Sequence, residues 1–170
     1  RWLDNETAKE ASIVAAVAAQ TSGNVATTRA SVDEALHLGA SPKEARLKDL
    51  SNWLLQEDAI ALATNAMKAN RLADARSSYT EAIRLGVPKS DRRLAAVEAF
   101  VAKEDAKELS VVAAKASVTS NNYNVAKANY EHALSLGVPS SESRLAEVKR
   151  WLDNETAKEA SIVAAVAAQT

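Results

Sequence analysis

The stretch Arg1–Thr21, RWLDNETAKEASIVAAVAAQT, recurs residue for residue at Arg150–Thr170, so that position 1 is repeated at position 150, 149 residues later. An identity over 21 residues does not arise by chance. Either the chain samples a tandem array whose units are 149 residues long, or the first helix was copied by an engineer onto the far end. Both interpretations make the chain part of a periodic object, and a regular helical scaffold is the structure that they predict.

A shorter period lies inside the 149-residue unit. Gly39, Gly86 and Gly137 each follow a leucine, at spacings of 47 and 51 residues. Small or apolar residues precede each glycine at intervals of 3 and 4, which is one face of a helix. They are Val25, Thr28, Val32 and Ala35; Leu72, Ala75, Tyr79 and Ala82; and Tyr123, Ala126, Tyr130 and Ala133. The pattern predicts short helices at about 25–38, 72–85 and 123–136, each ended by its glycine in the left-handed conformation.

A long helix is expected after each glycine. An acidic residue in its first turn (Glu44, Asp91, Glu142), an Arg-Leu pair and an aromatic (Trp53, Phe100, Trp151) follow in order. From Trp53 to the small residue Ala63 there are 10 positions, whereas the next two repeats have 14. Four residues are about one helical turn, a difference that a continuous helix tolerates. We therefore expect unbroken helices at about 42–69, 89–120 and 140–170, with 1–21 as a truncated copy.

The fold class that follows is all-α. We expect one helical-repeat domain over 1–170, with repeats at about 1–41, 42–88 and 89–139 and a terminal duplicate helix at 140–170.

Residues 61–88, ALATNAMKANRLADARSSYTEAIRLGVP, resemble a tetratricopeptide (TPR) repeat. The matching residues are Ala63, Ala75, Tyr79, Ala82 and Leu85; then Ala114, Tyr123, Ala126, Tyr130, Ala133 and Leu136; and, more loosely, Ala16, Val25, Thr28, Val32, Ala35 and Leu38. The resemblance implies a right-handed α-solenoid of alternating long and short antiparallel helices. The period departs from the 34 residues typical of the family.

The resemblance also implies a concave groove lined by the first helix of each pair. Its candidate residues are Ile13, Val17, Ile60, Thr64, Val111, Lys115, Ile162 and Val166. This mostly apolar row could hold a peptide or a helix of a partner protein. The alternative interpretation is that these residues pack adjacent long helices together. Lys115 is the one residue of the row suited to clamping a carboxylate, so we expect no carboxylate clamp in this groove.

For the other repeated residues, a structural role is favoured over a binding or metal-binding role. Trp53, Phe100 and Trp151 are expected in the core, with a binding patch as the alternative, and Tyr79 and Tyr130 are expected to be largely buried. Aligned on the aromatics, Glu6, Glu57, Glu104 and Glu155 form a column, more often a solvated face than a cation site or a stripe for a basic partner. His37 and His132 occupy different repeat positions, which does not favour a metal site.

Composition narrows the function classes. The net charge is −1 and cysteine is absent, which disfavours nucleic acid as a partner and excludes thiol chemistry. No apolar run approaches the roughly 18 residues of a membrane span. No phosphate loop or nucleophile motif is present, so we expect neither cofactor nor enzymatic activity. The expected function is a soluble structural or scaffolding segment, cytoplasmic or cytoskeletal, that associates head to tail. The alternative is an adaptor that binds peptides.

Overall fold

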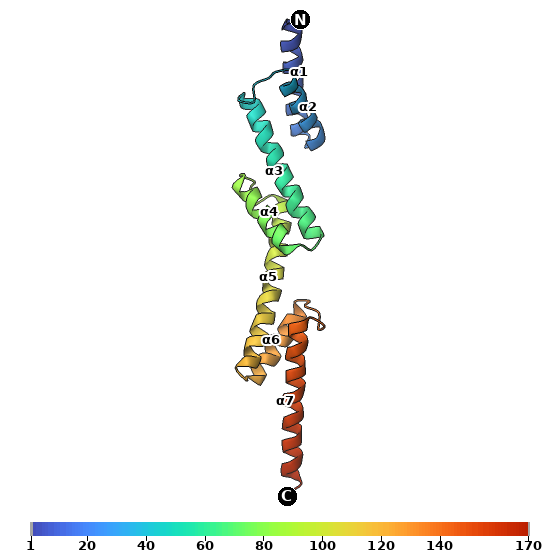
Figure 1. The fold of residues 1–170 in the computed structure, drawn as a ribbon, viewed down its shortest axis with the longest axis vertical. Helices are drawn as coiled ribbons and strands as arrows, with labels where there is room; N and C mark the ends of the chain where they lie inside the picture. Colours follow the sequence, from blue (N-terminus) through green and yellow to red (C-terminus); the bar gives the residue numbers. More distant parts are fainter. Residues whose placement is uncertain (1, 170) are drawn as a thin grey trace. The chain divides into compact units, whose positions relative to one another are not determined.

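The computed structural model describes the backbone of residues 2–169 and the side chains of residues 3–169. This part of the chain is all-α: it forms seven helices and no strand (Figure 1). The helices are α1 (Trp2–Thr21), α2 (Val25–His37), α3 (Ala45–Lys68), α4 (Leu72–Arg84), α5 (Arg92–Thr119), α6 (Tyr123–Ser135) and α7 (Ser143–Ala167). The long segments around Glu57, Glu104 and Glu155 are unbroken helix, which confirms the interpretation of the four-residue length difference as one turn.

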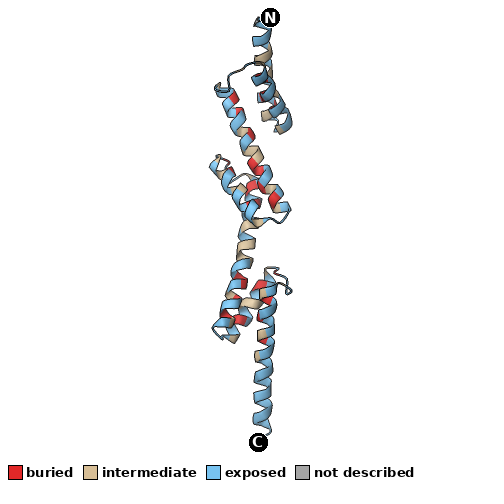
Figure 2. Ribbon diagram, viewed as in Figure 1, coloured by how far each residue is buried: buried red, intermediate tan, exposed pale blue. Residues whose placement is uncertain are grey.

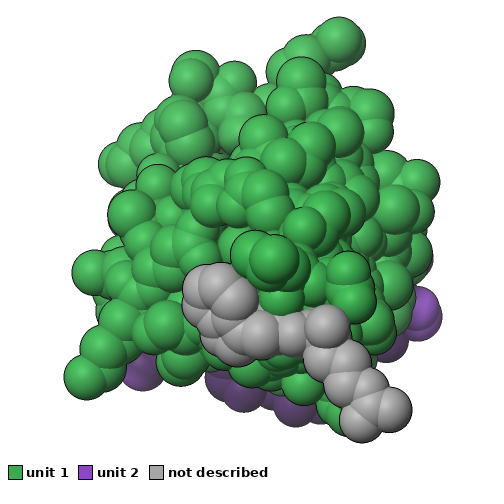
Figure 3. Space-filling model, turned by 90° about the horizontal axis from the view of Figure 1, so that it is seen from above, with its two compact units in different colours: residues 1–99 green, residues 100–170 purple. Residues whose placement is uncertain are grey.

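The chain divides into two compact units, residues 1–99 and residues 100–170, which Figure 3 colours separately. The boundary falls inside α5. The single domain expected over residues 1–170 therefore comprises two units.

Unit 1 has two apolar clusters. In the first, α1 and α2 pack together and α3 packs against both, which buries Ile13, Ala16, Val32, Ala35, Leu47, Leu50 and Leu54. In the second, α3 and α4 pack together, and Ala59, Ile60, Ala82, Val87 and Leu94 are buried. These residues account for much of the buried colour on α3 in Figure 2. Small residues on the short helices allow the backbone of each short helix to lie close to the long helices against which it packs.

Unit 2 repeats the first of these clusters. Its buried residues are Val111 and Ala114 of α5, Ala126 and Ala133 of α6, Val138, and Leu145, Val148 and Leu152 of α7. Six of them occupy the same positions relative to Gly137 as buried residues of α1, α2 and α3 occupy relative to Gly39, while Ala126 corresponds to the buried Thr28 and Val138 to the partly buried Ala40. Two stretches of different sequence therefore build the same core from the same pattern of apolar residues.

A left-handed residue ends each of the first six helices. Gly39, Gly86 and Gly137 have φ of 89°, 88° and 86°, which confirms the predicted glycine stops. After Gly39, for example, the amide of Ala40 donates to Ala35 O at 2.9 Å, while Gly39 itself donates to Leu36 O at 2.9 Å. These two bonds form a Schellman motif.

Asparagine takes the same role at the ends of α3 and α5. Asn70 and Asn121 have φ of 55° and 54°, a conformation that asparagine tolerates better than most residues. These two stops were not predicted from the sequence pattern.

The long helices begin three residues later than predicted. The amide of Glu44 donates to Ser41 O, and that of Glu142 to Pro139 O, so a turn precedes each helix. Glu44 and Glu142 are consequently N-cap residues and not members of the first turn. The Glu142 carboxylate accepts a bond from the Leu145 amide at 2.8 Å, which satisfies one free donor of the helix start.

Candidate interaction surface

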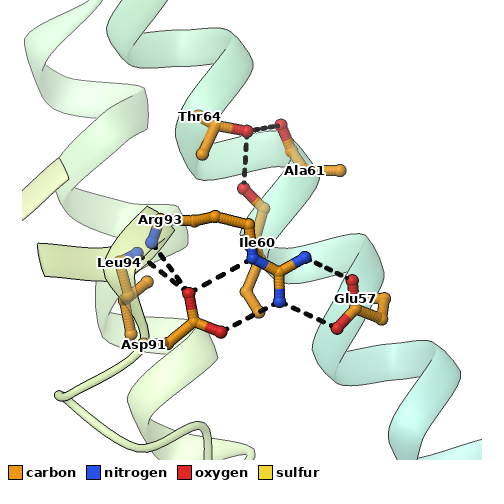
Figure 4. A network of polar contacts seen from close by, with 7 residues as sticks. All are labelled: Glu57, Ile60, Ala61, Thr64, Asp91, Arg93 and Leu94. Atoms are coloured by element: carbon orange, nitrogen blue, oxygen red, sulfur yellow. Dashed lines mark hydrogen bonds and ion pairs between the residues drawn. The ribbon is translucent and has the colours of Figure 1, made fainter. Parts of the chain in front are cut away.

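An arginine at the start of α5 ties two long helices together. Arg93 donates to both Glu57 oxygens, at 2.6 and 3.0 Å, and to both Asp91 oxygens, at 3.2 and 2.9 Å (Figure 4). Asp91 also accepts from the backbone amide of Arg93 at 2.8 Å. The carboxylate of Asp91 therefore orients the arginine and caps the first turn of α5 at the same time.

The same arrangement occurs at the start of the other two long helices. Arg46 binds Glu10 at 2.7 and 2.8 Å and Glu44 at 2.9 Å. Arg144 binds Glu108 at 2.6 and 2.8 Å and Glu142 at 2.9 Å. In all three cases the distal glutamate lies 36 residues before the arginine. We call each of these sets an arginine clamp.

The clamps change the ionisation of their members. Hydrogen bonding to Arg46 lowers the pKa of Glu10, and Arg144 likewise lowers the pKa of Glu108. Hydrogen bonding to Arg93 lowers the pKa of Asp91. Each carboxylate is therefore held in its charged form by the guanidinium beside it.

The clamps correct the predicted alignment of the glutamate column. Glu57 corresponds in structure to Glu10 and Glu108, which lie one turn beyond the residues aligned on the aromatics. Glu6, Glu104 and Glu155 instead pair with Lys9, Lys107 and Lys158, each at 2.6 Å. The second repeat is one turn shorter between its aromatic and its buried small residue. Glu57 is therefore both four residues after an aromatic and 36 residues before an arginine, whereas the other repeats use two different glutamates for these two positions. The constant spacing of 36 residues to an arginine was the sequence signal that would have identified Glu10 and Glu108.

Three candidate groove residues lie in the core. Ile13, Ile60 and Val111 are only 2 to 3% exposed, and each belongs to one of the apolar clusters. They cannot line an open groove, so the alternative interpretation, packing between helices, is the right one for them. The prediction failed because apolar residues that face the core and apolar residues that line a groove recur along a helix at the same spacing, so that the sequence pattern does not distinguish them.

The other candidate groove residues have varied surroundings. The Thr64 hydroxyl donates to Ile60 O and Ala61 O of its own helix, at 2.9 and 3.1 Å (Figure 4). Lys115 forms an ion pair with Glu147 at 2.9 Å. Val17 is 38% exposed, whereas Ile162 and Val166 are 64% and 60% exposed.

The repeated aromatics are less buried than predicted. Trp53 packs on the edge of the first cluster of unit 1, and Trp151 lies 6.3 Å from Tyr123, between ring centroids. Phe100 is partly buried. Trp53 and Trp151 therefore cover their clusters from outside.

Tyr79 and Tyr130 are also partly buried rather than largely buried. Burial, followed by the neighbouring Glu98 carboxylate, raises the pKa of Tyr79. The Tyr79 hydroxyl is buried, yet it makes no hydrogen bond of good geometry among the described residues.

The two copies of the 21-residue sequence bury opposite halves. Leu152 near the start of α7 is 7% exposed, whereas its copy Leu3 in α1 is 71% exposed. Towards the other end the order reverses: Ile13 is 2% exposed and its copy Ile162 is 64% exposed. Figure 2 shows the last turns of α7 in the exposed colour. Since the sequences are identical, the difference is caused by the neighbours of each helix.

The exposed part of α7 forms a continuous apolar surface. Ile162, Val163 and Val166 are each at least 60% exposed. A shallow depression beside them is lined by Tyr123, Asn124, Glu155, Lys158, Glu159 and Ile162. Glu159 is the copy of Glu10, but no ion pair of Glu159 is present among the described residues. We call residues 154–167 the α7 end.

Among the described residues, no group of three or more acidic, histidine or cysteine side chains could hold a metal ion. Within the same part of the chain, none of the helices combines the length and apolarity needed to cross a membrane. No protein-family model matches the sequence, and no curated protein and no solved structure is significantly similar to it.

Proposed function

We propose that the chain is a structural, non-enzymatic segment of a tandem-repeat array, built as a TPR-like right-handed α-solenoid. The observation that carries this proposal is the recurrence of the arginine clamp at a constant spacing of 36 residues. Each clamp joins one long helix to the start of the next. A contact that recurs with the period of the sequence is what a stack of nearest-neighbour repeats requires.

The distribution of the apolar core supports the same proposal. The clusters are small and each is shared by consecutive helices, whereas a globular domain has one common core. Repetition also duplicates every surface, while an active site needs one asymmetric group of residues. We therefore place the function in the scaffold, with further repeats or further copies as its partners.

Chains that carry one, two and three of the 149-residue units test the proposal. The maximum dimension from small-angle X-ray scattering should rise by a constant increment with each unit, because each repeat contacts only its neighbours. The free energy of unfolding should also rise with the number of units. A maximum dimension that stays nearly constant, which means that the units collapse on one another, would contradict the scaffold.

An adaptor that binds a peptide or helix is the second candidate. The observation in its favour is an apolar depression between α3 and α4, lined in part by Leu55, Leu62 and Leu85. Leu55 and Leu62 are 51% and 62% exposed, a position that differs from the groove expected from the sequence. If the chain is such an adaptor, the substitution Leu62→Ser will lower its affinity for an amphipathic partner helix. The adaptor makes no prediction that the maximum dimension of the multi-unit chains rises by a constant increment.

A further inference from the structure

The place that α1 occupies in unit 1 is a defined binding site. Its apolar floor is formed by Val32 and Ala35 of α2 and by Leu47, Leu50 and Leu54 of α3. Its polar rim consists of two groups: Arg46, which holds Glu10, and the Leu38 carbonyl, which accepts a bond from the Asn5 side chain at 3.2 Å. We call this site the α1 seat.

The α7 end carries copies of the four α1 side chains that bind the floor and the rim of this seat. Asn154, Glu159, Ile162 and Ala165 are the copies of Asn5, Glu10, Ile13 and Ala16. All four are exposed in the structure. The α1 seat therefore shows what covers such a surface, and it supplies an arginine for the carboxylate of Glu159.

We propose that the α7 end of one molecule occupies the α1 seat of a second copy and displaces its α1. The proposal rests on the periodic array proposed above, because α1 and α7 are the same position of that array. Two helices cannot fill one position. The repeat consequently continues from one molecule to the next by exchange of the helix, and two molecules placed end to end without displacement would not continue it.

The exchange replaces one set of side chains in the seat by an identical set. The displaced α1 and the incoming α7 end make the same interactions there, so the balance depends on chain connectivity. The covalent link gives α1 a high effective concentration at its own seat. The closed monomer should therefore dominate in dilute solution, and exchange should increase with protein concentration. Its geometry is head to tail, which allows chains of molecules to form.

A charge exchange between two full-length variants tests the proposal in trans. In Arg46→Glu the seat repels Glu10 of its own α1 and also Glu159 of other copies. In Glu159→Arg the α7 end repels the normal seat. Each variant alone should be monomeric, whereas the mixture should form a 1:1 heterodimer, because the arginine introduced by the second variant then faces the glutamate introduced by the first. Sedimentation velocity measures the masses, and far-UV circular dichroism checks that both variants remain helical.

The outcomes of this experiment separate the alternatives. A heterodimer that forms only in the mixture supports exchange. A mixture that stays monomeric at millimolar concentration, or a Glu159→Arg variant that associates as strongly as the parent chain, overturns it. If the scattering increments of the multi-unit chains hold while the mixture stays monomeric, the array survives and the exchange alone is wrong.

A second pair of variants tests the apolar contact without changing any charge. Ile13→Ala weakens only the resident helix, so it should raise the association constant by about tenfold or more. Ile162→Ala weakens only the incoming helix and should lower the constant by a similar factor. The double variant, which carries both substitutions, should have an association constant close to that of the parent chain. An association constant that Ile13→Ala leaves unchanged, while Ile162→Ala lowers it, would contradict exchange, because a merely adhesive α7 surface does not respond to Ile13.

Discussion

At the scale of single residues, the arginine clamps join two helices by charge while the adjacent leucine joins them by burial. Arg93 is half exposed, but it fixes Glu57, whose side chain is only 15% exposed. Leu94, the next residue, is fully buried. The pair Arg-Leu therefore places one side chain at the rim of each interface and the other in its centre. The Arg-Leu pair is visible in the sequence, whereas the distant glutamate that each arginine binds was not predicted.

The clamp at Arg93 should make a measurable contribution to stability. Arg93→Met keeps most of the side-chain stem and removes the bonds to Glu57 and Asp91, which should cost about 1 kcal/mol, the upper range for a surface ion-pair network. Arg92→Met is the matched control, because Arg92 is exposed and no ion pair of it is present among the described residues. Urea-induced unfolding at pH 7 measures both. Equal stabilities of the two variants would show that the clamp adds nothing to the stability of the fold.

The lowered carboxyl pKa values predict the direction of the pH dependence. The pKa of Glu108 is lowered in the folded state, mainly by its hydrogen bond to Arg144. Glu108 therefore stabilises the fold at pH values above the unfolded pKa of about 4.5, and this contribution is lost as the pH falls through the lower folded value. The stability difference between the parent and Glu108→Gln should shrink between about pH 5 and pH 3.

Urea midpoints measured from about pH 7 to pH 3 check this prediction. Glu131→Gln, on the exposed face of α6, is the control and should run parallel to the parent throughout. A difference between the parent and Glu108→Gln that stays constant over this range would refute the role of Arg144 in holding the carboxylate charged.

At the scale of elements, the ends of the helices were partly readable from sequence. The glycine stops and the continuity of the long helices follow from local rules, because a left-handed residue and a missing helix breaker act within one turn. The helix starts were placed three residues early, since the turns at Ser41 and Pro139 use the same acidic residue that would suit a first turn. The stops at Asn70 and Asn121 were missed because asparagine is common elsewhere on helix surfaces.

The stop at Gly137 should depend on backbone conformation alone. Gly137 has φ of 86°, and a Cβ added there would meet nothing within 4 Å. Gly137→Ala should therefore cost about 1 kcal/mol through strain in the left-handed region. Gly137→Asn should cost less, since asparagine tolerates that region. Equal losses for both variants in urea unfolding would indicate a steric role that the surroundings of Gly137 do not show.

At the scale of the whole molecule, each helix is completed by what packs against it. The periodic pattern correctly predicted which residues form helical faces, but it could not distinguish a groove from a core. Ile13, Ile60 and Val111 are buried because other helices cover them, and this information lies in distant residues. Ile162 belongs to the same row and is exposed because no such neighbours cover it among the described residues.

Four alanine substitutions in the duplicated sequence measure what each half of that sequence contributes to stability in α1 and in α7. The same sequence buries its second half in α1 and its first half in α7. Ile13→Ala and Leu152→Ala should each cost about 2 to 5 kcal/mol, while the same changes at their sequence copies, Ile162→Ala and Leu3→Ala, should cost less than about 0.5 kcal/mol. Urea unfolding of the four variants at low protein concentration measures these differences. Equal losses within each pair of copies, or the reverse order, would contradict the account.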